Sequence, residues 1–139
     1  MDLDLQEPEG GLTPHLTIRG GRAAEAIEFY RKAFGVEELM RHPSDDGRLM
    51  HAHLKVNGSS LMMHDDFPEH GHAPAGDPAC VMLHLQVNDA DAWWNRAVGA
   101  GAKVIMELAD QFWGDRYGQL EDPFGHRWSI GAPSAPAQE

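Results

Sequence analysis

Five histidines of this chain lie in short segments in which polar and apolar residues alternate. They are His15, His51, His53, His64 and His84. Because alternate side chains of a β-strand point to opposite faces of its sheet, the alternation predicts that all five share one face, mixed with Met and Thr. Neutral imidazoles bind zinc, copper, iron or nickel and exchange protons near neutral pH. The alternative for each is a hydrogen-bonded histidine with a structural role.

The segments that carry these histidines belong to a repeated order of elements. Alternation predicts a first strand within residues 12–21, and helical spacing predicts a helix over 22–34 that ends at Gly35. Three further strands are predicted at 36–43, 48–56 and 59–66, separated by turn-forming residues. This first half therefore has the order β-α-β-β-β.

The same order begins again after a polar loop over 67–78. A strand within 80–89 is followed by a helix over 90–102, a strand over 103–110, a hairpin and a last strand over 126–130. His15 and His84 begin the matching tetrapeptides His-Leu-Thr-Ile and His-Leu-Gln-Val before the two helices. We therefore predict an α+β fold of two tandem β-α-β-β-β modules that arose by duplication.

Module 1 is predicted to span residues 12–66 and module 2 residues 79–131. Residues 67–78 form the linker, and 1–11 and 132–139 are predicted to be flexible tails. Together they make a single domain at 12–131, as expected for 139 residues.

Strand alternation also predicts which side chains lie beneath the helices. It places Leu12, Met50 and Val81 on the helix side of the sheets, and it places Leu49 on the opposite side with the histidines. A sheet face that no helix covers must be buried on something, and two such sheets can form a cup. We expect the ligand of this protein in that cup.

Composition excludes several classes of function. Eleven Lys and Arg against twenty-two Asp and Glu give a net charge of −11, which repels nucleic acid. An anionic surface would attract a cationic ligand, and the alternative is that the charge serves only solubility. No apolar run approaches the roughly 20 residues of a membrane span, and the acidic start is unlike a secretory signal. Cys80 is the single cysteine, so no internal disulfide is expected. We therefore expect a cytoplasmic protein without a nucleic-acid or membrane partner.

Three segments carry a family resemblance that covers residues 12–131. They are PHLTIRG with AAEAIEFYRKAFGVEELMR, then RLMHAHLKVNGSSLMMHD, and above all DQFWGDRYGQLEDPFGHRWSI. The chain resembles the vicinal oxygen chelate superfamily and, within it, the PhnB-like branch of the glyoxalase, bleomycin resistance protein and dioxygenase family. The resemblance implies paired modules whose eight strands wrap into a cup, commonly as a homodimer with exchanged modules.

The same resemblance indicates where a metal ion and a ligand would lie. Metal-using members hold their ion with a His on the first strand and a carboxylate on the fourth strand of each module. In this chain the corresponding residues are Thr13, Met82, Met62 and Ser129, none of which matches that ligand pattern. His15 and His84 lie two residues further along on the same face, so they are the candidate metal ligands. Thr13, Met62, Met82 and Ser129 are retained as ligand-binding candidates.

The C-terminal segment adds two further candidates. The DPFG sequence resembles the tight turn that leads into the last strand of the family. The preceding hairpin would let Trp113 and Arg116 reach over the cup. The alternative is that they serve turn packing and an ion pair between Arg116 and a carboxylate.

Two hypotheses follow. The first is a metal-dependent lyase or isomerase of the glyoxalase type, with zinc, nickel, iron or manganese at His15 and His84, His51 or His53 exchanging protons, and Arg116 pairing with substrate charge. The second is a protein without a cofactor that sequesters a small aromatic, cationic compound, as bleomycin resistance proteins do, with Met62, Met82 and Trp113 lining the site.

Overall fold

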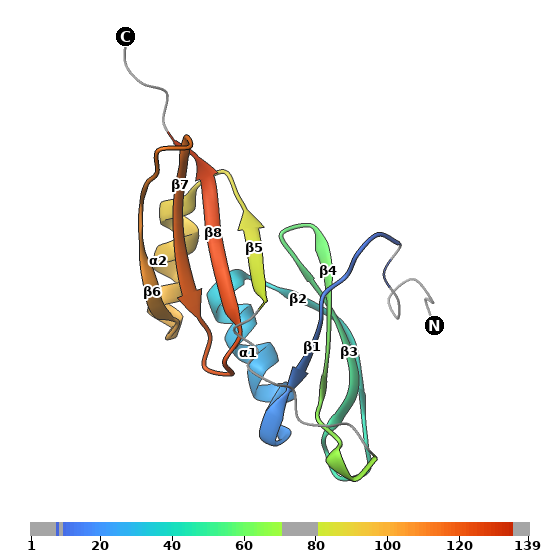
Figure 1. The fold of residues 1–139 in the computed structure, drawn as a ribbon. Coiled ribbons are helices and arrows are strands. Elements are labelled where there is room, and N and C mark those ends of the chain that lie inside the picture. The colour runs from blue at the N-terminus through green and yellow to red at the C-terminus, as the bar shows by residue number, and fades with distance from the viewer. Residues whose placement is uncertain (1–7, 9, 71–80, 135–139) are drawn as a thin grey trace. The chain divides into compact units, whose positions relative to one another are not determined.

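The computed structural model describes residues 8, 10–70 and 81–134. The chain divides into two compact units, Met1–Gly76 and Asp77–Glu139, and the described residues of each unit are treated separately (Figure 1). Most of the predicted linker, residues 71–78, lies outside the described part, as do residues 1–7, 9 and 135–139 of the predicted tails.

Each unit is a β-α-β-β-β module, which confirms the predicted α+β fold. The first contains β1 (His15–Ile18), α1 (Ala23–Phe34), β2 (Glu37–Pro43), β3 (Leu49–Val56) and β4 (Ser59–Asp65), with short 3-10 turns at Arg19–Gly21 and Pro68–His70. The second contains β5 (Met82–Gln86), α2 (Ala90–Ala100), β6 (Lys103–Asp110), β7 (Asp115–Glu121) and β8 (Arg127–Pro133). In the described residues, neither helix has the length and apolar character needed to cross a bilayer.

The two sheets have equivalent strand orders. They are β1-β4-β3-β2 and β5-β8-β7-β6, and in each the first strand pairs in parallel with the last while the other pairs are antiparallel (Figure 1). Both sheets also carry a register irregularity at the same place, between Glu38 and Met40 in β2 and between Val104 and Met106 in β6. Shared order, direction and irregularity support the predicted duplication.

Helix α1 forms where helical spacing predicted it. Its buried residues Ala23, Ala26, Ile27, Tyr30 and Phe34 form one stripe, which packs with the buried side of the sheet. The helix ends at Gly35, whose φ of 67° is the left-handed conformation that glycine adopts without strain. In α2 the side chain of Asp89 accepts a hydrogen bond from the Ala92 amide and caps the first turn.

The alternation rule is correct for most of β1, β3 and β4 but wrong at the start of β3. Leu49 is 1% exposed and Met50 is 60% exposed, the reverse of the prediction. The pairing of β2 with β3 shifts between His42 and Pro43, which pair with His51 and Leu49. Met50 is therefore the extra residue of a β-bulge, and the alternation of side chains between the two faces is interrupted there. Leu12 and Val81 were also predicted beneath the helices, and both are exposed. They precede the first paired residues of β1 and β5.

The last strand is longer than predicted. Strand β8 continues to Pro133, and Ala132 is buried, so residues 132 and 133 belong to the fold rather than to a tail. The Ser134 amide also donates a hydrogen bond to the carbonyl of Gly114.

Candidate functional site

The face of the first sheet opposite its buried core carries a row of four imidazoles. The rings of His15 and His64 lie 4.8 Å apart between centroids, those of His15 and His51 lie 6.2 Å apart, and those of His51 and His42 lie 6.4 Å apart. Each of the four strands contributes one ring. His42 was not among the predicted site residues, because its position opposite His51 depends on the pairing of β2 with β3.

Strand pairing explains how this imidazole row forms. Met62 of β4 pairs with His15 of β1 and with His53 of β3, so the three side chains share one face. His64 pairs with Thr17, whose hydroxyl lies 3.4 Å from Nε2 of the imidazole, and Nδ1 of His64 donates to the carbonyl of Asp65 at 2.7 Å. The backbone bond fixes the orientation of the His64 ring.

His53 has a different environment from the row. Its side chain is 2% exposed, and its Nε2 lies 2.8 Å from the hydroxyl of Ser60. A buried, hydrogen-bonded imidazole matches the structural alternative stated above for each histidine.

The row disfavours a positive charge on His15. Partial burial lowers the pKa of His15 below its ordinary value, and repulsion by His64 and then by His51 lowers it further. His15 is therefore held in its neutral form at neutral pH.

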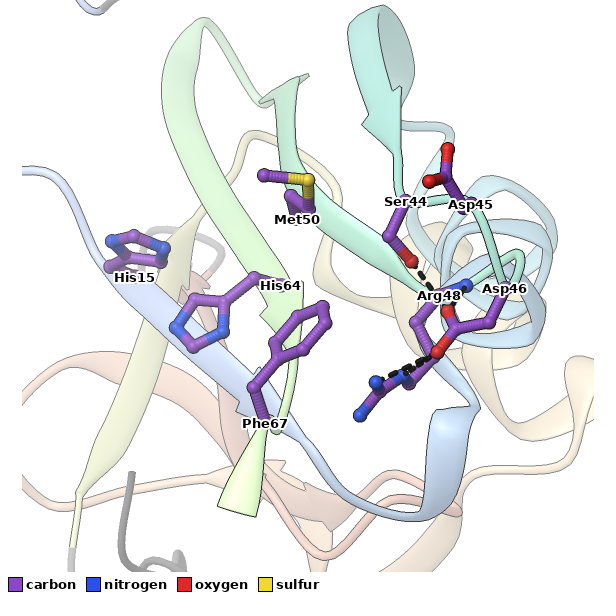
Figure 2. Close-up of a pocket in the computed structure, with 8 residues that line it drawn as sticks. All are labelled: His15, Ser44, Asp45, Asp46, Arg48, Met50, His64 and Phe67. Atoms are coloured by element: carbon purple, nitrogen blue, oxygen red, sulfur yellow. Dashed lines mark hydrogen bonds and ion pairs between the residues drawn. The ribbon is translucent and has the colours of Figure 1, made fainter. Parts of the chain in front are cut away.

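Two hollows lie beside the row in the first module. One, with a volume of about 620 Å³, is lined by His15, His64, Met50 and Phe67 on one side and by Ser44, Asp45, Asp46 and Arg48 on the other (Figure 2). The second, of about 590 Å³, is lined by residues that include Thr13, His42, His51 and Met62. Thr13 and Met62 thus line a hollow, and Met50 and Phe67 join the site although no sequence signal marked them.

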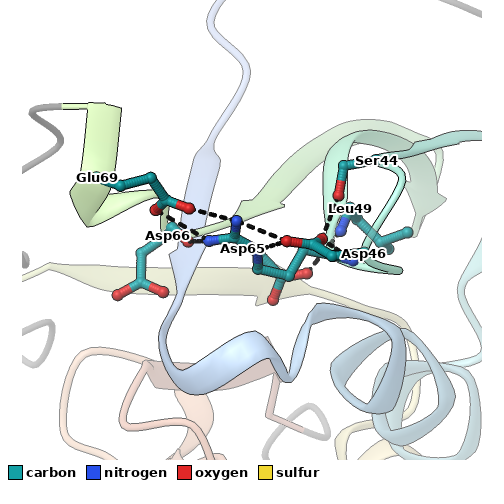
Figure 3. A network of polar contacts seen from close by, with 7 residues as sticks. Ser44, Asp46, Leu49, Asp65, Asp66 and Glu69 are labelled. Atoms are coloured by element: carbon teal, nitrogen blue, oxygen red, sulfur yellow. Dashed lines mark hydrogen bonds and ion pairs between the residues drawn. The ribbon is translucent and has the colours of Figure 1, made fainter.

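A polar network supports the rim of the first hollow (Figure 3). Arg48 pairs with Asp46 at 2.7 Å and with Glu69, and its guanidinium carbon lies 4.3 Å above the ring centroid of Phe67. Hydrogen bonds from Arg48 and then from Ser44 hold the pKa of Asp46 well below its ordinary range. Arg48 is thereby committed to partners within the module.

The open face of the second sheet centres on His84. Its Nδ1 lies 2.7 Å from the hydroxyl of Ser129, and its Nε2 lies 2.8 Å from the side-chain oxygen of Gln86. The amide oxygen accepts only, so Nε2 carries the hydrogen and Ser129 donates to Nδ1. Ser129 is 1% exposed and pairs with His84 across β5 and β8, which places this bond within the sheet.

Two aromatic rings extend from His84 along the same face. The Tyr117 ring stacks on the imidazole at 6.0 Å between centroids and 24° between planes, and the Trp113 ring meets Tyr117 at 5.6 Å and 69°. Trp113, which is 48% exposed, thus reaches from the β6–β7 turn onto the sheet. Tyr117, like His42, Met50 and Phe67, was not among the predicted site residues.

Arg116 lies on the other face of β7. Its guanidinium donates to both carboxylate oxygens of Asp91, at 2.9 and 3.0 Å, and to Asp110 at 3.3 Å. Gly118, two residues along the strand, faces Trp94 of α2, which identifies this as the helix side. The structure thus places Arg116 in the ion pair that was the stated alternative to contact with substrate. Met82 begins β5 and is partly exposed.

Comparison with known proteins shows the family. The profile of the Glyoxalase/Bleomycin resistance protein/Dioxygenase superfamily matches residues 13–130. The chain belongs to this superfamily. An uncharacterized protein of Mycobacterium tuberculosis is 48% identical over 130 residues, which cover 90% of this chain and 75% of the relative.

Solved structures of other proteins share the fold of this chain. TioX from Micromonospora sp. ML1 has a TM-score of 0.70 and 25% identity, with 88% of this chain and 99% of TioX covered. The PhnB protein from Bacillus cereus has a TM-score of 0.70 and 22% identity, with 88% and 99% covered. These comparisons agree with the resemblance to the PhnB-like branch.

The metal site expected of metal-using superfamily members does not fit the residues that the structure describes at the corresponding positions. Strand pairing puts Met62 beside His15 and Ser129 beside His84, so the neighbour of each imidazole carries no carboxylate. Both ring nitrogens of His84 are already in hydrogen bonds. Across residues 10–70 and 81–134, no group of three His, Cys, Asp or Glu side chains is arranged to hold a metal ion.

Proposed function

We propose that this protein binds a small aromatic compound without a metal ion, on the helix-free sheet faces of its modules, in the manner of a sequestering bleomycin-resistance-type protein. The observation that carries the proposal is the pairing of His84 with Ser129. At the place where a carboxylate would complete a metal site, a buried hydroxyl donates to the imidazole and occupies its Nδ1.

The chemistry of the two faces supports an aromatic ligand. The first hollow combines imidazole edges with the thioether of Met50 and the ring of Phe67. The second module offers the rings of Trp113 and Tyr117. Aromatic and thioether groups favour flat, polarizable ligands, and the net charge of −11 increases the encounter rate of a cationic one.

The metal-dependent lyase or isomerase is supported less well. That reaction requires an ion and a proton-transferring group, and the buried His53 is hydrogen-bonded to Ser60. His51 lies in the row, where its ring meets those of His15 and His42. We therefore derive no metal-dependent step.

We propose further that the protein forms a homodimer, as the family resemblance implies. Light scattering coupled to gel filtration checks this directly. A mass near 31 kDa, twice the 15.4 kDa of one chain, is expected. A mass of one chain at all concentrations would contradict it.

Metal analysis combined with binding tests the proposed function. Protein purified without chelator is expected to contain less than about a tenth of a divalent ion per chain. Indole, 1-naphthylmethylamine and acridine are titrated against it before and after dialysis with EDTA. At least one of them is expected to bind, with the same affinity in both preparations.

The competing result is equally specific. About one ion per chain, lost in both His15→Ala and His84→Ala, would support the metal site and contradict the proposal. Binding that disappears with EDTA and returns with zinc, nickel, iron or manganese would do the same. Failure of all three compounds to bind would also contradict it.

A further inference from the structure

We propose that the open face of the second module recognises a planar heteroaromatic ring, which stacks on the surface formed by His84, Tyr117 and Trp113 and accepts a hydrogen bond from the Tyr117 hydroxyl. This inference rests on the proposed function and specifies the class of ligand. We call these three residues the aromatic ladder.

The geometry of the aromatic ladder suits stacking. The centroid separations of 5.6 and 6.0 Å lie within the range of favourable ring contacts, and both contacts are made within one module. Trp113 is half exposed, so part of its surface remains available to a ligand. A planar ring placed on this surface would extend contacts that already exist.

Two members of the ladder, His84 and Tyr117, are held in place before a ligand arrives. Hydrogen bonds from Ser129 and to Gln86 hold the two ring nitrogens of His84, and stacking holds Tyr117 against it. The backbone of Gly131 lies beneath the imidazole with no side chain between them. Little rotamer freedom is left to lose on binding, which favours affinity.

The hydrogen bond from Gln119 leaves the Tyr117 hydroxyl able to act as a donor at the edge of the aromatic ladder. The side-chain amide of Gln119 donates to the Tyr117 hydroxyl at 3.1 Å. Among the hydrogen bonds of the described residues, this hydroxyl acts only as an acceptor, so its own hydrogen can be donated to a ligand. A ring nitrogen or carbonyl in the plane of an aromatic ligand would accept it.

The first module shows that the ladder is a specific feature of the second. By strand pairing, Tyr117 corresponds to His51 and Gly131 to His64, while His84 corresponds to His15. The first module therefore has imidazoles where the second has a phenol ring and a glycine. The duplicated halves have diverged at the positions that make the ladder.

Binding of acridine to the full chain tests the inference. Acridine is planar with one ring nitrogen, and perhydroacridine has the same skeleton without aromatic planarity. Perhydroacridine is a protonated amine at neutral pH, so the negative charge of the protein favours this control and cannot explain tighter binding of acridine. Isothermal calorimetry is expected to show that acridine binds at least about tenfold more tightly than perhydroacridine. Equal affinities would overturn the inference.

Two substitutions locate the site. Trp113→Ala is expected to weaken acridine binding about tenfold through lost stacking, and Tyr117→Phe about fivefold through the lost hydrogen bond. Trp93→Ala, which removes the same side chain from α2, is the matched control and is expected to leave the affinity unchanged. Circular dichroism and thermal melting verify that each variant is folded.

The outcomes separate this inference from the proposed function. If acridine binds independently of metal but neither Trp113→Ala nor Tyr117→Phe changes its affinity, the ladder is not the site and the proposed function stands. If Tyr117→Phe alone has no effect, the hydrogen-bonding part of the inference is wrong. If no aromatic compound binds, both proposals are wrong.

Discussion

Gly131 and His84 are in close contact across β8 and β5. A Cβ atom on Gly131 would lie 2.9 Å from Cε1 and 3.4 Å from Nε2 of the imidazole. Only glycine at this position leaves room for His84 in its present orientation, where it bonds to Ser129 and stacks on Tyr117. A backbone feature thus determines how the face of the second module is arranged.

Replacing Gly131 by Ala is expected to displace the imidazole rather than to unfold the protein. Because the clash is with a side chain that can rotate, the loss of stability should be about 1 kcal/mol. The affinity for acridine should also fall, because the displaced imidazole no longer stacks on Tyr117. Thermal melting measures the loss of stability, and the NMR resonances of His84 report the displacement of its imidazole. Unchanged His84 resonances would contradict the expected displacement.

Gly118→Ala is expected to be much more harmful. A Cβ atom there would lie 2.5 Å from the Trp94 ring and 2.9 Å from the Cα of Leu108, so a backbone and a buried indole would both have to move. We expect a loss of about 3 kcal/mol in the free energy of unfolding. Urea denaturation measures it.

Gly99→Ala is the matched control for that substitution. Gly99 lies in α2, and a Cβ atom there meets nothing within 4 Å. The alanine should stabilise the protein by about 0.5 to 1 kcal/mol, since alanine is the better helix former. Equal effects of the two substitutions would show that packing beneath Trp94 is unimportant.

The carboxylate of Asp65 in β4 joins α1 and β3 of the first module, and Figure 3 shows its contact with Leu49 of β3. It is buried and accepts hydrogen bonds from the amides of Ala23 at 2.8 Å and Leu49 at 2.7 Å. Asp65→Ala leaves both amides without this acceptor and is expected to cost about 3 kcal/mol in urea denaturation. The exposed Asp45→Ala should change stability by less than about 0.5 kcal/mol. Similar values for both would refute the assigned role of Asp65.

His15 should make the protein less stable in weak acid. Its pKa is lowered in the folded state, so below about pH 6.5 the unfolded chain binds the proton more readily and acid favours unfolding. The stability lost through His15 therefore increases as the pH falls through the window between the unfolded and folded pKa values. Melting temperatures from pH 8 to pH 5 should fall less steeply for His15→Gln than for the wild type. An NMR titration of His15 with a midpoint above 6.5 would contradict the argument.

Much of the fold could be predicted from the sequence because its signals are local. Helical spacing and Gly35 defined α1, and the recurrence of His-Leu before each helix indicated the duplication. Alternation correctly separated Leu16 and Ile18 from His15. It failed at Met50, since a bulge depends on how β3 pairs with β2 and not on β3 alone.

The candidate site could be predicted only in part. Local sequence placed His15, His51, His64 and His84 on open faces, and it identified Trp113 as able to reach such a face. It gave no sign that Tyr117 joins Trp113 to His84, or that Arg116 turns toward Asp91, because each contact forms between strands or between a strand and a helix.

The sequence by itself determined the order of elements, the duplication and the face on which most histidines lie, because periodicity and turn residues act over a few neighbouring positions. Only the tertiary structure decided which side chains meet. Strand register sets the partner of every residue in a sheet, and register is fixed by packing over the whole module. The contact between His84 and Gly131 depends on that register.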